Sequence, residues 1–354
     1  MNKILVIQQK MIGDVLVSSI LCENLALEFP NATIDYLVYD STTPVLENKE
    51  KTFNVIPFTK KHRESKKELF TLAKQIKSNN YDVIIDAYCK LESWIIVAMS
   101  DAKKKISFDK GYINFFYTDL IKRHNTAKTN LGLTIEQRLN LLKPLGIKTP
   151  KITHPSLVVN DLEKETTKDF LNKYNINLNN PLVMVSVLGS SLDKTYPLPY
   201  MAKILDEIIA FKPMQLLFNY IPNQTEYAKE LYNLCNEKTK ECIYFEAIGK
   251  SLRDFIAIMD SCEFIIGNDG GAINMAKALN KPAFTIYSPI INKEGWNSFE
   301  DGNKYISVHL KDYKPNLFEN LSSKKIKKLN NQLYLEFKPE YIKPLLLHFL
   351  KQNA

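Results

Sequence analysis

Short apolar runs alternate with amphipathic stretches along the first part of the chain. Lys3–Gln8 is an apolar run typical of a buried strand, and the stretch after it repeats apolar residues every three or four positions, as a helix does. Pro30 and Asn31 end that helix, and a second apolar run follows at Ile34–Val38. This strand–helix–strand order predicts the start of a parallel sheet.

The same alternation continues to Gly146. The pattern predicts a helix over Lys66–Ser78, a strand over Asp82–Ala87, and helices over Leu91–Met99 and Ile135–Leu145. Between them, Ile106–Asn130 is rich in aromatic residues and has no clear period, so we assign no regular element to it.

A second array begins after Leu162–Tyr174, which is itself predicted to be a helix. Its predicted strands are Leu182–Val187, Gln215–Phe218, Glu263–Ile266 and Ala283–Tyr287. Its predicted helices are Tyr200–Ala210, Glu226–Asn236, Leu252–Met259, Ala272–Leu279 and Tyr341–Gln352. Two arrays of similar size predict an α/β protein with two Rossmann-like, doubly wound domains, which we place at residues 1–165 and 166–335. Such sheets bind ligands at the carboxyl ends of their strands, so we expect a site in a cleft between the domains.

The charge balance narrows the range of partners. The chain has 47 Lys and Arg against 39 Asp and Glu, a formal charge of +8. A basic surface favours anionic partners such as phosphorylated sugars or acidic lipid headgroups, although lysine-rich codon usage explains the excess equally well. We find no nucleic-acid-binding signature and expect no nucleic-acid partner. The five cysteines form no CxxC pair, and the N-terminal apolar run is too short for a signal peptide, so a cytoplasmic protein is expected.

The most informative polar segment follows the predicted strand Glu263–Ile266. There the chain runs through Asp269, Gly270 and Gly271 directly into a helix. The two glycines let a ligand approach the backbone, the free amides at the helix start favour a phosphate, and Asp269 can accept hydrogen bonds from sugar hydroxyls. The alternative is a tight turn in which Asn268 or Asp269 only caps the helix, which is the more frequent role of an isolated Asn-Asp-Gly-Gly.

A second polar loop follows the first strand of the second array. Ser190 and Ser191 offer hydroxyl donors, and Lys194 offers a positive charge that a diphosphate leaving group needs when a glycosidic bond breaks. The alternative is a solvated loop with an exposed lysine.

Two acidic residues open helices at the carboxyl ends of predicted strands. Asp14, which follows Gly13, can act as a general base for an acceptor hydroxyl or can complement the helix dipole, and both roles need the same position. Glu226 can hold ribose hydroxyls or can cap its own helix.

Several motifs are missing from the sequence. It has no GxGxxG after the first strand, no Walker A pattern, no Asp-x-Asp pair and no GxSxG elbow, and its five histidines show no metal-ligand spacing. Dinucleotide enzymes, P-loop nucleotidases, triad hydrolases and sugar-nucleotide enzymes that bind a metal through Asp-x-Asp are therefore not supported.

In order and spacing, these segments resemble glycosyltransferase family 9, the heptosyltransferase family of lipopolysaccharide core synthesis. Ile4–Ile7 with Ile12–Val15 resembles the family's N-terminal strand, loop and helix, and Ser190–Pro197 resembles its phosphate-binding loop. The donor-binding strand, loop and helix of the family are similar to Asn268–Gly271 together with Ala276, Ala278, Leu279 and Pro282. Asp82–Ser93 also resembles a family segment in which a strand ends in Asp and is followed by a basic residue and Ser.

The resemblance implies a GT-B fold and an inverting, metal-independent transfer of a sugar without a cofactor. The donor implied is a nucleotide sugar, ADP-heptose, and the acceptor is a lipopolysaccharide-core or other glycolipid at the inner face of the cytoplasmic membrane. It also implies that the C-terminal helix, residues 336–354, packs back towards the N-terminal domain.

Site roles are carried over position by position. Asp14 would be the general base, with Gly13 beside it in the substrate site, and Lys194 would pair with the donor phosphates. The remaining donor-binding residues would be Ser190 and Ser191 through their hydroxyls, Gly270 and Gly271 through their amides, Asp269 at the sugar hydroxyls and Glu226 at the ribose.

The chain departs from the family pattern at the donor loop. The family usually has Thr-Gly after the Asp and a His three residues after that Gly, where this chain has Gly270-Gly271 and Asn274. Asn274 can donate a hydrogen bond to a substrate but cannot carry a proton. Three alternatives therefore stand beside the heptosyltransferase: a GT-B transferase that uses another nucleotide sugar, a sugar-nucleotide hydrolase, and a catalytically silent homologue that binds nucleotide sugars.

Overall fold

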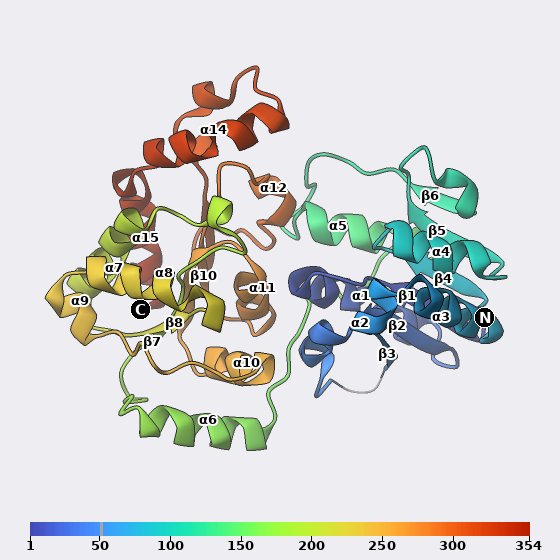
Figure 1. Cartoon of the computed structure of the whole chain (residues 1–354), viewed down its shortest axis with the longest axis horizontal. Coiled ribbons are helices and arrows are strands. Elements are labelled where there is room, and N and C mark those ends of the chain that lie inside the picture. Colours follow the sequence, from blue (N-terminus) through green and yellow to red (C-terminus); the bar gives the residue numbers. More distant parts are fainter. Residues whose placement is uncertain (50–51) are drawn as a thin grey trace. The chain divides into compact units, whose positions relative to one another are not determined.

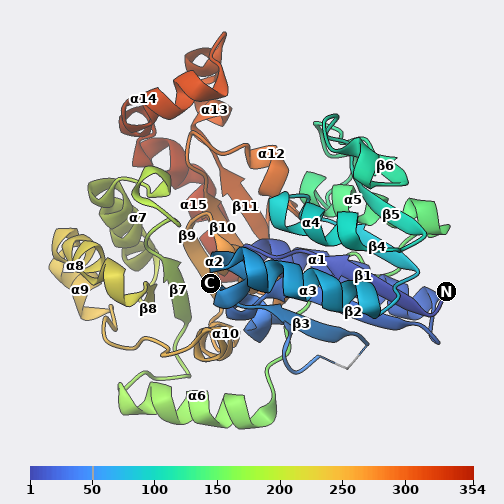
Figure 2. The same ribbon diagram turned by 45° about the vertical axis from the view of Figure 1, so that its right-hand side comes forward.

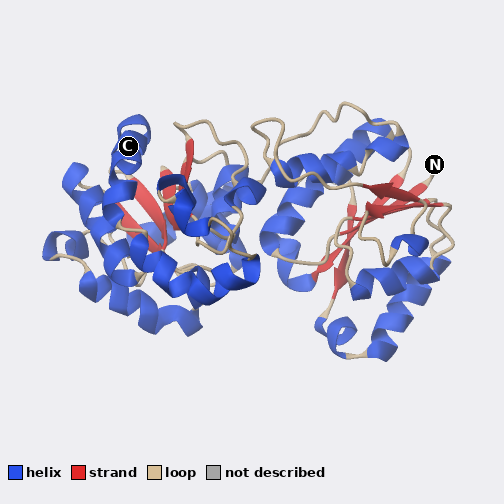
Figure 3. Cartoon of the chain, turned by 90° about the horizontal axis from the view of Figure 1, so that it is seen from above, coloured by secondary structure: helices blue, strands red, loops and turns tan. Residues whose placement is uncertain are grey.

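The computed structural model describes residues 1–49 and 52–354, and the chain divides into two compact units, Met1–Val158 and Val159–Ala354. Each unit is built on one parallel sheet, and Figure 1 labels most of the elements. Strands lie inside each unit and helices lie outside, as Figure 3 shows by colour. The predicted α/β class is therefore confirmed.

Unit 1 contains a six-stranded sheet in the order β3-β2-β1-β4-β5-β6, with every pair parallel. Its strands are β1 (Lys3–Ile7), β2 (Thr33–Tyr39), β3 (Asn54–Phe58), β4 (Val83–Asp86), β5 (Lys104–Phe108) and β6 (Asp119–Ile121). Its α-helices are α1 (Ile12–Glu28), α2 (Lys60–Glu64), α3 (Lys66–Ser78), α4 (Leu91–Met99) and α5 (Leu133–Asn140). The described residues of this unit also form the 3-10 turns η1 (Asp40–Leu46), η2 (Asn114–Phe116) and η3 (Lys143–Leu145).

The central strands of unit 1 are those that the apolar runs predict. Leu5 and Ile7 of β1 face the core beneath α3 and α4, which lie side by side in Figure 2. Strands buried on both faces are continuously apolar, which makes them visible in the sequence. By contrast, β3 and β6 are edge strands, and β6 lies with part of β5 in the aromatic-rich segment to which the sequence assigned no element.

Unit 2 contains a five-stranded parallel sheet in the order β11-β10-β9-β7-β8. Its strands are β7 (Leu182–Ser186), β8 (Gln215–Asn219), β9 (Phe264–Asn268), β10 (Ala283–Ile286) and β11 (Tyr305–Val308). The longer helices are α6 (Asp161–Lys173), α7 (Leu198–Phe211), α8 (Thr225–Leu234), α10 (Leu252–Asp260), α11 (Gly271–Ala278), α14 (Ser323–Glu336) and α15 (Pro339–Asn353). The shorter elements are η4 (Leu192–Lys194), η5 (Pro222–Gln224), α9 (Glu237–Glu241), α12 (Lys293–Trp296), α13 (Leu310–Tyr313) and η6 (Pro315–Phe318).

Alternate residues of β7 enter two different cores. Val183 and Val185 pack with side chains of α7 and α15, whereas Leu182 and Met184 pack with side chains of α10 and α11. Successive side chains of a strand point to opposite faces, so the central strand of a two-sided sheet must be apolar at every position. All five β7 residues are buried.

The boundary between the units differs from the predicted one at 165/166. Unit 2 already begins at Val159, because α6 packs on α10 and Arg253 donates from Nε and Nη2 to the two carboxylate oxygens of Glu163, each at 2.7 Å. The predicted C-terminal segment 336–354 also belongs to unit 2, where Leu346 and Phe349 of α15 are fully buried in the core. Packing of that helix towards the first domain stays a prediction.

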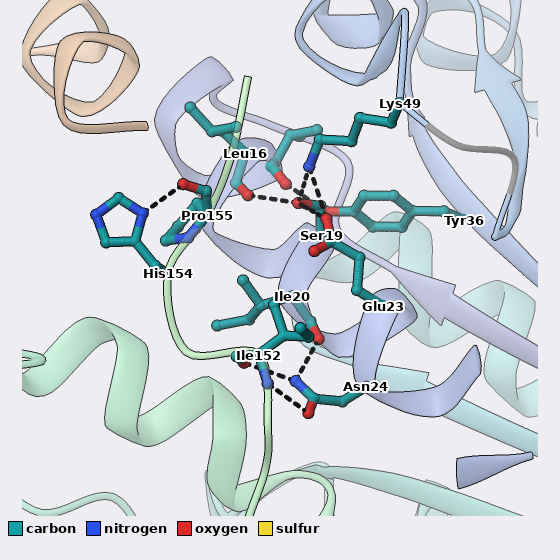
Figure 4. Close-up of polar contacts among 11 residues, drawn as sticks. Leu16, Ser19, Ile20, Glu23, Asn24, Tyr36, Lys49, Ile152, His154 and Pro155 are labelled. Carbon is teal, nitrogen blue, oxygen red and sulfur yellow. Dashed lines mark hydrogen bonds and ion pairs between the residues drawn. The ribbon is translucent and has the colours of Figure 1, made fainter. Parts of the chain in front are cut away.

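The last part of unit 1 is fastened to α1 by one buried amide (Figure 4). Asn24 Nδ2 donates to the carbonyls of Ile20 and Ile152 at 2.8 and 2.7 Å, and Asn24 Oδ1 accepts from the amides of Lys151 and Ile152 at 2.8 and 3.0 Å. A segment without regular structure thereby has its backbone groups satisfied inside the unit.

None of the helices in the described part of the chain combines the length and apolarity needed to cross a bilayer.

Candidate donor and base sites

The strand order of unit 2 reverses between β9 and β7. From β7 the chain continues to β8 on one side, and from β9 it continues to β10 and β11 on the other. In doubly wound sheets, ligands bind at the carboxyl ends of the strands that flank such a switch point. The loop after β7 carries Ser190, Ser191 and Lys194, and the loop after β9 carries Asp269 and Gly270, so the structure brings these predicted residues to one place.

The loop after β7 is a compact 3-10 turn. Thr195 Oγ1 accepts from the Gly189 amide and donates to the Ser191 carbonyl, both at 3.0 Å. The Ser191 hydroxyl donates to the Asp193 carboxylate, while Ser190 is exposed and Lys194 is partly exposed. The Ser190 hydroxyl therefore makes none of the bonds that hold the turn together, and it is accessible to a ligand.

Gly189 is a site residue that the sequence analysis missed. A Cβ atom at this position would lie 2.3 Å from the carbonyl oxygen of Lys194, a separation that real Cβ atoms do not show. Only glycine lets the loop close this tightly. The sequence signal was a glycine directly after an apolar strand.

Asn268, the last residue of β9, joins the two loops. Its Oδ1 accepts from the Tyr196 amide at 2.7 Å, and its Nδ2 donates to the carbonyls of Ser186 and Val187 at 3.0 and 2.9 Å. Asn268 is fully buried. Its side chain therefore does not cap α11, and the capping alternative does not hold for this residue.

Two residues far along the chain bind the backbone of the 3-10 turn η4 (Leu192–Lys194), which we call the lysine turn. The Asp193 carbonyl accepts from Asn330 Nδ2 at 2.6 Å and from Ser288 Oγ at 3.0 Å. Asn330 lies on α14 and Ser288 follows β10, and both are buried. The sequence offered no signal for either, because Asn330 is 137 positions from Asp193.

The loop after β9 leads into α11, whose N-cap is Gly270 with no side-chain capping bond. A Cβ atom at Gly270 would meet nothing within 4 Å, so the space beside the helix start is open. Burial raises the pKa of the nearby Asp269 carboxyl to about 6, against the opposing effects of the Lys277 and Lys194 charges. Asn274 Nδ2 donates to the Gly270 carbonyl at 3.3 Å.

Glu226 lies in the first turn of α8, beyond the carboxyl end of β8, and is exposed. Because β8 pairs with β7, this carboxylate lies at the same edge of the sheet as the lysine turn. The N-cap of α8 is Gln224, which makes no side-chain capping bond.

In unit 1 the strand order reverses between β1 and β4, and Asp14 follows β1 in the first turn of α1, next to the buried Gly13. Asp14 Oδ2 accepts from the Met11 amide at 3.3 Å, and Asp14 Oδ1 accepts from Arg138 Nη2 at 2.5 Å. The Asp14 carboxylate thus binds a free backbone amide at the start of α1, which fits the structural alternative given for this residue, and it also forms an ion pair with Arg138.

Arg138, on α5, was not predicted. It is buried, and its other nitrogens donate to Ser18 Oγ at 2.7 Å and to the Thr134 carbonyl at 3.2 Å. A signal existed: only four arginines occur among the 47 basic residues, Arg63, Arg123, Arg138 and Arg253. In a chain that otherwise uses lysine, an arginine marks a position where a planar, forked donor is needed.

The Asp at the end of β4 serves the fold. The Asp86 carboxylate accepts from the amides of Tyr88 and Cys89 and from the hydroxyls of Ser93 and Tyr117, at 2.7–3.1 Å. Burial raises the pKa of this carboxyl, and the four donors oppose that effect. Every one of these bonds is internal, so the carboxylate organises the loop before α4.

Two doubly wound domains, each built on a parallel sheet with polar loops at its switch point, define a two-domain protein of the GT-B class. The solved structures agree. The chain superposes with a TM-score of 0.71 and 17% identity on a family 9 glycosyl transferase from Veillonella parvula, covering 95% of this chain and 97% of the other. The TM-score is 0.67, at 18% identity and 95% and 99% coverage, for the ADP-heptose lipopolysaccharide heptosyltransferase II of Escherichia coli. The predicted GT-B fold is confirmed.

The model of glycosyltransferase family 9 (heptosyltransferase) matches residues 69–323, so the chain belongs to this family and is a glycosyltransferase. It is 23% identical over 290 residues to lipopolysaccharide heptosyltransferase 3 of Escherichia coli, covering 78% of this chain and 80% of the relative. It is also 23% identical over 302 residues to lipopolysaccharide heptosyltransferase 1 of Campylobacter coli, covering 80% and 83%. The resemblance drawn from the sequence is confirmed.

Proposed function

We propose that this glycosyltransferase moves heptose from ADP-heptose to a hydroxyl of a lipopolysaccharide-core or other glycolipid acceptor, by an inverting mechanism that needs no metal. The observation that carries the proposal is the pair of loops at the switch point of unit 2, in which Asn268 ties the lysine turn to the start of α11. The names of the relatives, all lipopolysaccharide or lipooligosaccharide heptosyltransferases, support the substrate class.

The donor diphosphate binds between these loops. The Lys194 ammonium and the amides at the start of α11, at Gly270 and Gly271, neutralise the negative charge that grows on the leaving group. Ser190 and Ser191 add hydroxyl contacts. Asp269 accepts hydrogen bonds from the sugar hydroxyls and Glu226 from the ribose hydroxyls.

Asp14 is the general base. It takes the proton of the acceptor hydroxyl as the acceptor oxygen bonds to the anomeric carbon and the bond from that carbon to the phosphate oxygen breaks. ADP leaves with the electron pair of the broken bond. One displacement from the face opposite the leaving group inverts the anomeric configuration. Arg138 holds the carboxylate in place, which orients its free lone pairs.

The charge neutralisation in this scheme comes from the protein itself. The sequence has no Asp-x-Asp pair, and Lys194 with the helix amides takes the place that a divalent cation has in transferases built on that motif. Among the residues that the structure describes, no group of three or more His, Cys, Asp and Glu is arranged to hold a metal ion.

A different nucleotide sugar is the second candidate, and the donor loop motivates it. Gly270 and Asn274 stand where the family usually has Thr and His, and the space beside Gly270 is open. The open space beside Gly270 and the absence of an imidazole at position 274 suit a donor other than ADP-heptose.

Ligand-induced thermal stabilisation tests the donor first. The wild type and Lys194→Ala are melted with ADP, UDP, GDP and ADP-heptose, because a ligand at about 100 times its dissociation constant stabilises the native state by about 2.7 kcal/mol. A selective response to ADP and ADP-heptose, lost in Lys194→Ala, supports the proposal. Stabilisation by UDP or GDP alone would indicate a transferase that uses a different nucleotide sugar. No stabilisation by any of the four ligands would favour the catalytically silent homologue.

Release of ADP from ADP-heptose, with and without a glycolipid acceptor, tests the reaction. Transfer requires ADP release that depends on the acceptor and a product with the opposite anomeric configuration. Release that is equal without an acceptor indicates a hydrolase. Activity that survives treatment with a chelator supports the metal-independent mechanism.

The acceptor suggests a cytoplasmic protein that contacts the inner face of the membrane. Leu91, Tyr112 and Phe115 of unit 1 are 64%, 71% and 78% exposed, and Trp94 packs edge-on against Tyr112. Exposed apolar side chains on a basic protein suit an anionic bilayer surface. Sedimentation with phosphatidylglycerol vesicles tests this: we expect binding that Phe115→Asp weakens and phosphatidylcholine vesicles do not support. Equal sedimentation with both lipids, or no effect of the variant, would contradict it.

A further inference from the structure

Helix α14 carries a lysine cluster that has no part in the steps above. The first six residues of this helix include four lysines, and no acidic residue occurs from Ser322 to Leu335. All four lysines are exposed, and within the part of the chain that the structure describes none of them forms an ion pair. We call them the α14 lysines: Lys324, Lys325, Lys327 and Lys328.

The packing of α14 turns these lysines to the outside of unit 2. Ile326 and Leu329 pack against the core of the unit and define the inner face of the helix. Lys324 and Lys328, which are one turn apart, therefore lie on the opposite face. Leu335 lies two turns further along that outer face and is 59% exposed. In Figure 1 and Figure 2, α14 lies at the outer edge of its unit.

The charge pattern of α14 opposes the stability of its own helix. Lys324 and Lys325 lie in the first turn, where the helix dipole disfavours a cation and no acidic residue compensates. Both are also one turn from Lys328, and like charges at that spacing repel. Helix α6, in the same unit, carries three lysines among four acidic residues. A positive face that the fold does not need is complementary to an external anionic partner.

The other end of α14 is fixed to the donor site. Asn330 Nδ2 donates to the Asp193 carbonyl of the lysine turn at 2.6 Å. The hydroxyl of Tyr196, which follows that turn, donates to the Phe337 carbonyl at 2.6 Å. A surface bound by the α14 lysines is therefore held in a fixed relation to the donor loops of unit 2.

We propose that the α14 lysines dock unit 2 on the anionic phospholipid headgroups of a bilayer. The four lysines cover the outer half of an exposed helix and do not converge on one point, which suits an extended anionic surface better than a single small anion. Their ammonium groups bind lipid phosphates, and Leu335 adds an apolar contact on the same face. The inference goes beyond the proposed function, because it does not depend on the donor sugar or on the exposed apolar residues of unit 1.

Vesicle sedimentation tests the docking with two variants of equal net charge. The first replaces the α14 lysines: Lys324→Gln, Lys325→Gln, Lys327→Gln and Lys328→Gln. The control replaces four other exposed lysines of unit 2, on α6 and α7: Lys164→Gln, Lys168→Gln, Lys173→Gln and Lys203→Gln. Each lysine at an anionic surface favours binding by about fivefold, so the α14 variant should lose about 10²–10³-fold in affinity for vesicles that contain phosphatidylglycerol. The control should lose about fivefold or less.

Three results would overturn the docking proposal. The first is an α14 variant that binds phosphatidylglycerol vesicles as the wild type does, or no more weakly than the control variant. The second is a wild type that binds phosphatidylcholine vesicles equally well, or whose preference for phosphatidylglycerol survives about 0.5 M salt, which screens exposed charges. The third is tighter binding to a single-stranded oligonucleotide than to the vesicles, which would identify a nucleic-acid partner.

Two further measurements show that charge, and not folding, is responsible. The α14 variant should melt at or above the wild-type temperature, because the substitutions remove like-charge pairs from the helix. Replacing the same four positions with arginine should keep the affinity for phosphatidylglycerol vesicles, because arginine keeps the charge. Loss of binding in the arginine variant would contradict an electrostatic contact.

A transfer assay separates this inference from the proposed function. The acceptor is supplied either as a soluble, deacylated glycan or as a glycolipid in phosphatidylglycerol vesicles. We expect the α14 variant to match the wild type on the soluble acceptor and to be about tenfold slower or more on the vesicles. An equal loss on both acceptors means that the lysines act within the enzyme, and the docking fails. If the wild type transfers to neither acceptor, the proposed function is wrong, and sedimentation still decides whether α14 binds the bilayer.

Discussion

Asn268→Ala should damage both the stability of unit 2 and its affinity for the donor nucleotide. The wild-type amide is fully buried and makes three hydrogen bonds, one accepted from Tyr196 and two donated to the carbonyls of Ser186 and Val187. Alanine removes all three and leaves the backbone groups of both loops without these partners. The lysine turn then loses its attachment to β9.

The size of the effect follows from the number of bonds. A buried hydrogen bond contributes about 1 kcal/mol net, and a buried group left unsatisfied costs about 1–3 kcal/mol. We therefore expect a loss of about 3 kcal/mol in the free energy of unfolding. For a domain of this size, that lowers the melting temperature by roughly 6–12 °C. Because the turn carries Lys194, ADP affinity should fall by about tenfold or more.

Asn24→Ala is the matched control. This buried asparagine makes four hydrogen bonds to backbone groups, at 2.7–3.0 Å, but in unit 1 (Figure 4). Thermal denaturation and ADP calorimetry on both variants separate stability from binding. We expect both to melt earlier and only Asn268→Ala to lose ADP affinity. An Asn268→Ala protein that melts like the wild type, or an equal loss of ADP binding in Asn24→Ala, would refute the reasoning.

Three further predictions follow from the same contacts. Asp14→Asn should reduce transfer by about 10²–10⁴-fold with little change in donor binding, whereas Lys194→Ala should weaken binding far more, and equal effects on binding would contradict this division of roles. Gly189→Ala should lower both the melting temperature and the ADP affinity, because its Cβ would lie 2.3 Å from the Lys194 carbonyl oxygen. Gly270→Ala should melt as the wild type does, because nothing lies within 4 Å of a Cβ there. A lower melting temperature for Gly270→Ala than for Gly189→Ala would exclude the described loop geometry. Folding raises the pKa of Asp269 from 3.8 to about 6, so its ionised form costs folding free energy above about pH 6 and none below about pH 4. Asp269→Asn should therefore raise the melting temperature at about pH 7.5 but not at about pH 4, while weakening ADP-heptose binding; a lower melting temperature at about pH 7.5 would show that the carboxylate stabilises the fold.

The sequence predicted the central elements of both domains and missed the peripheral ones. β1, β4, β7 and β9 are buried on both faces, so their apolar character is continuous and visible without a structure. The edge strand β3 contains Asn54 and Pro57, and α14 begins with a run of lysines that the pattern presented only as charge. At an edge, solvent exposure relaxes the pattern that prediction depends on.

The candidate site divides in the same way. Asp14 in unit 1, and Lys194 and Asp269 in unit 2, could be placed from the sequence, because residues in the loops after parallel strands lie at the carboxyl edge of their own sheet. Arg138, Asn330 and Ser288 could not, since they reach the site from elements 124, 137 and 95 positions away from the residues they bind.

What the sequence determined by itself is the succession of strands and helices, the existence of two α/β domains and the loops that carry the candidate chemistry. These depend on the periodicity of apolar residues and on turn residues, which are properties of neighbours in the chain. Only the tertiary structure decided which side chains hold those loops: Arg138 binds Asp14, and Asn268 joins β9 to the loop after β7. The physical reason is that a buried charge or amide is chosen by what packs against it, and the packing partners lie far along the chain.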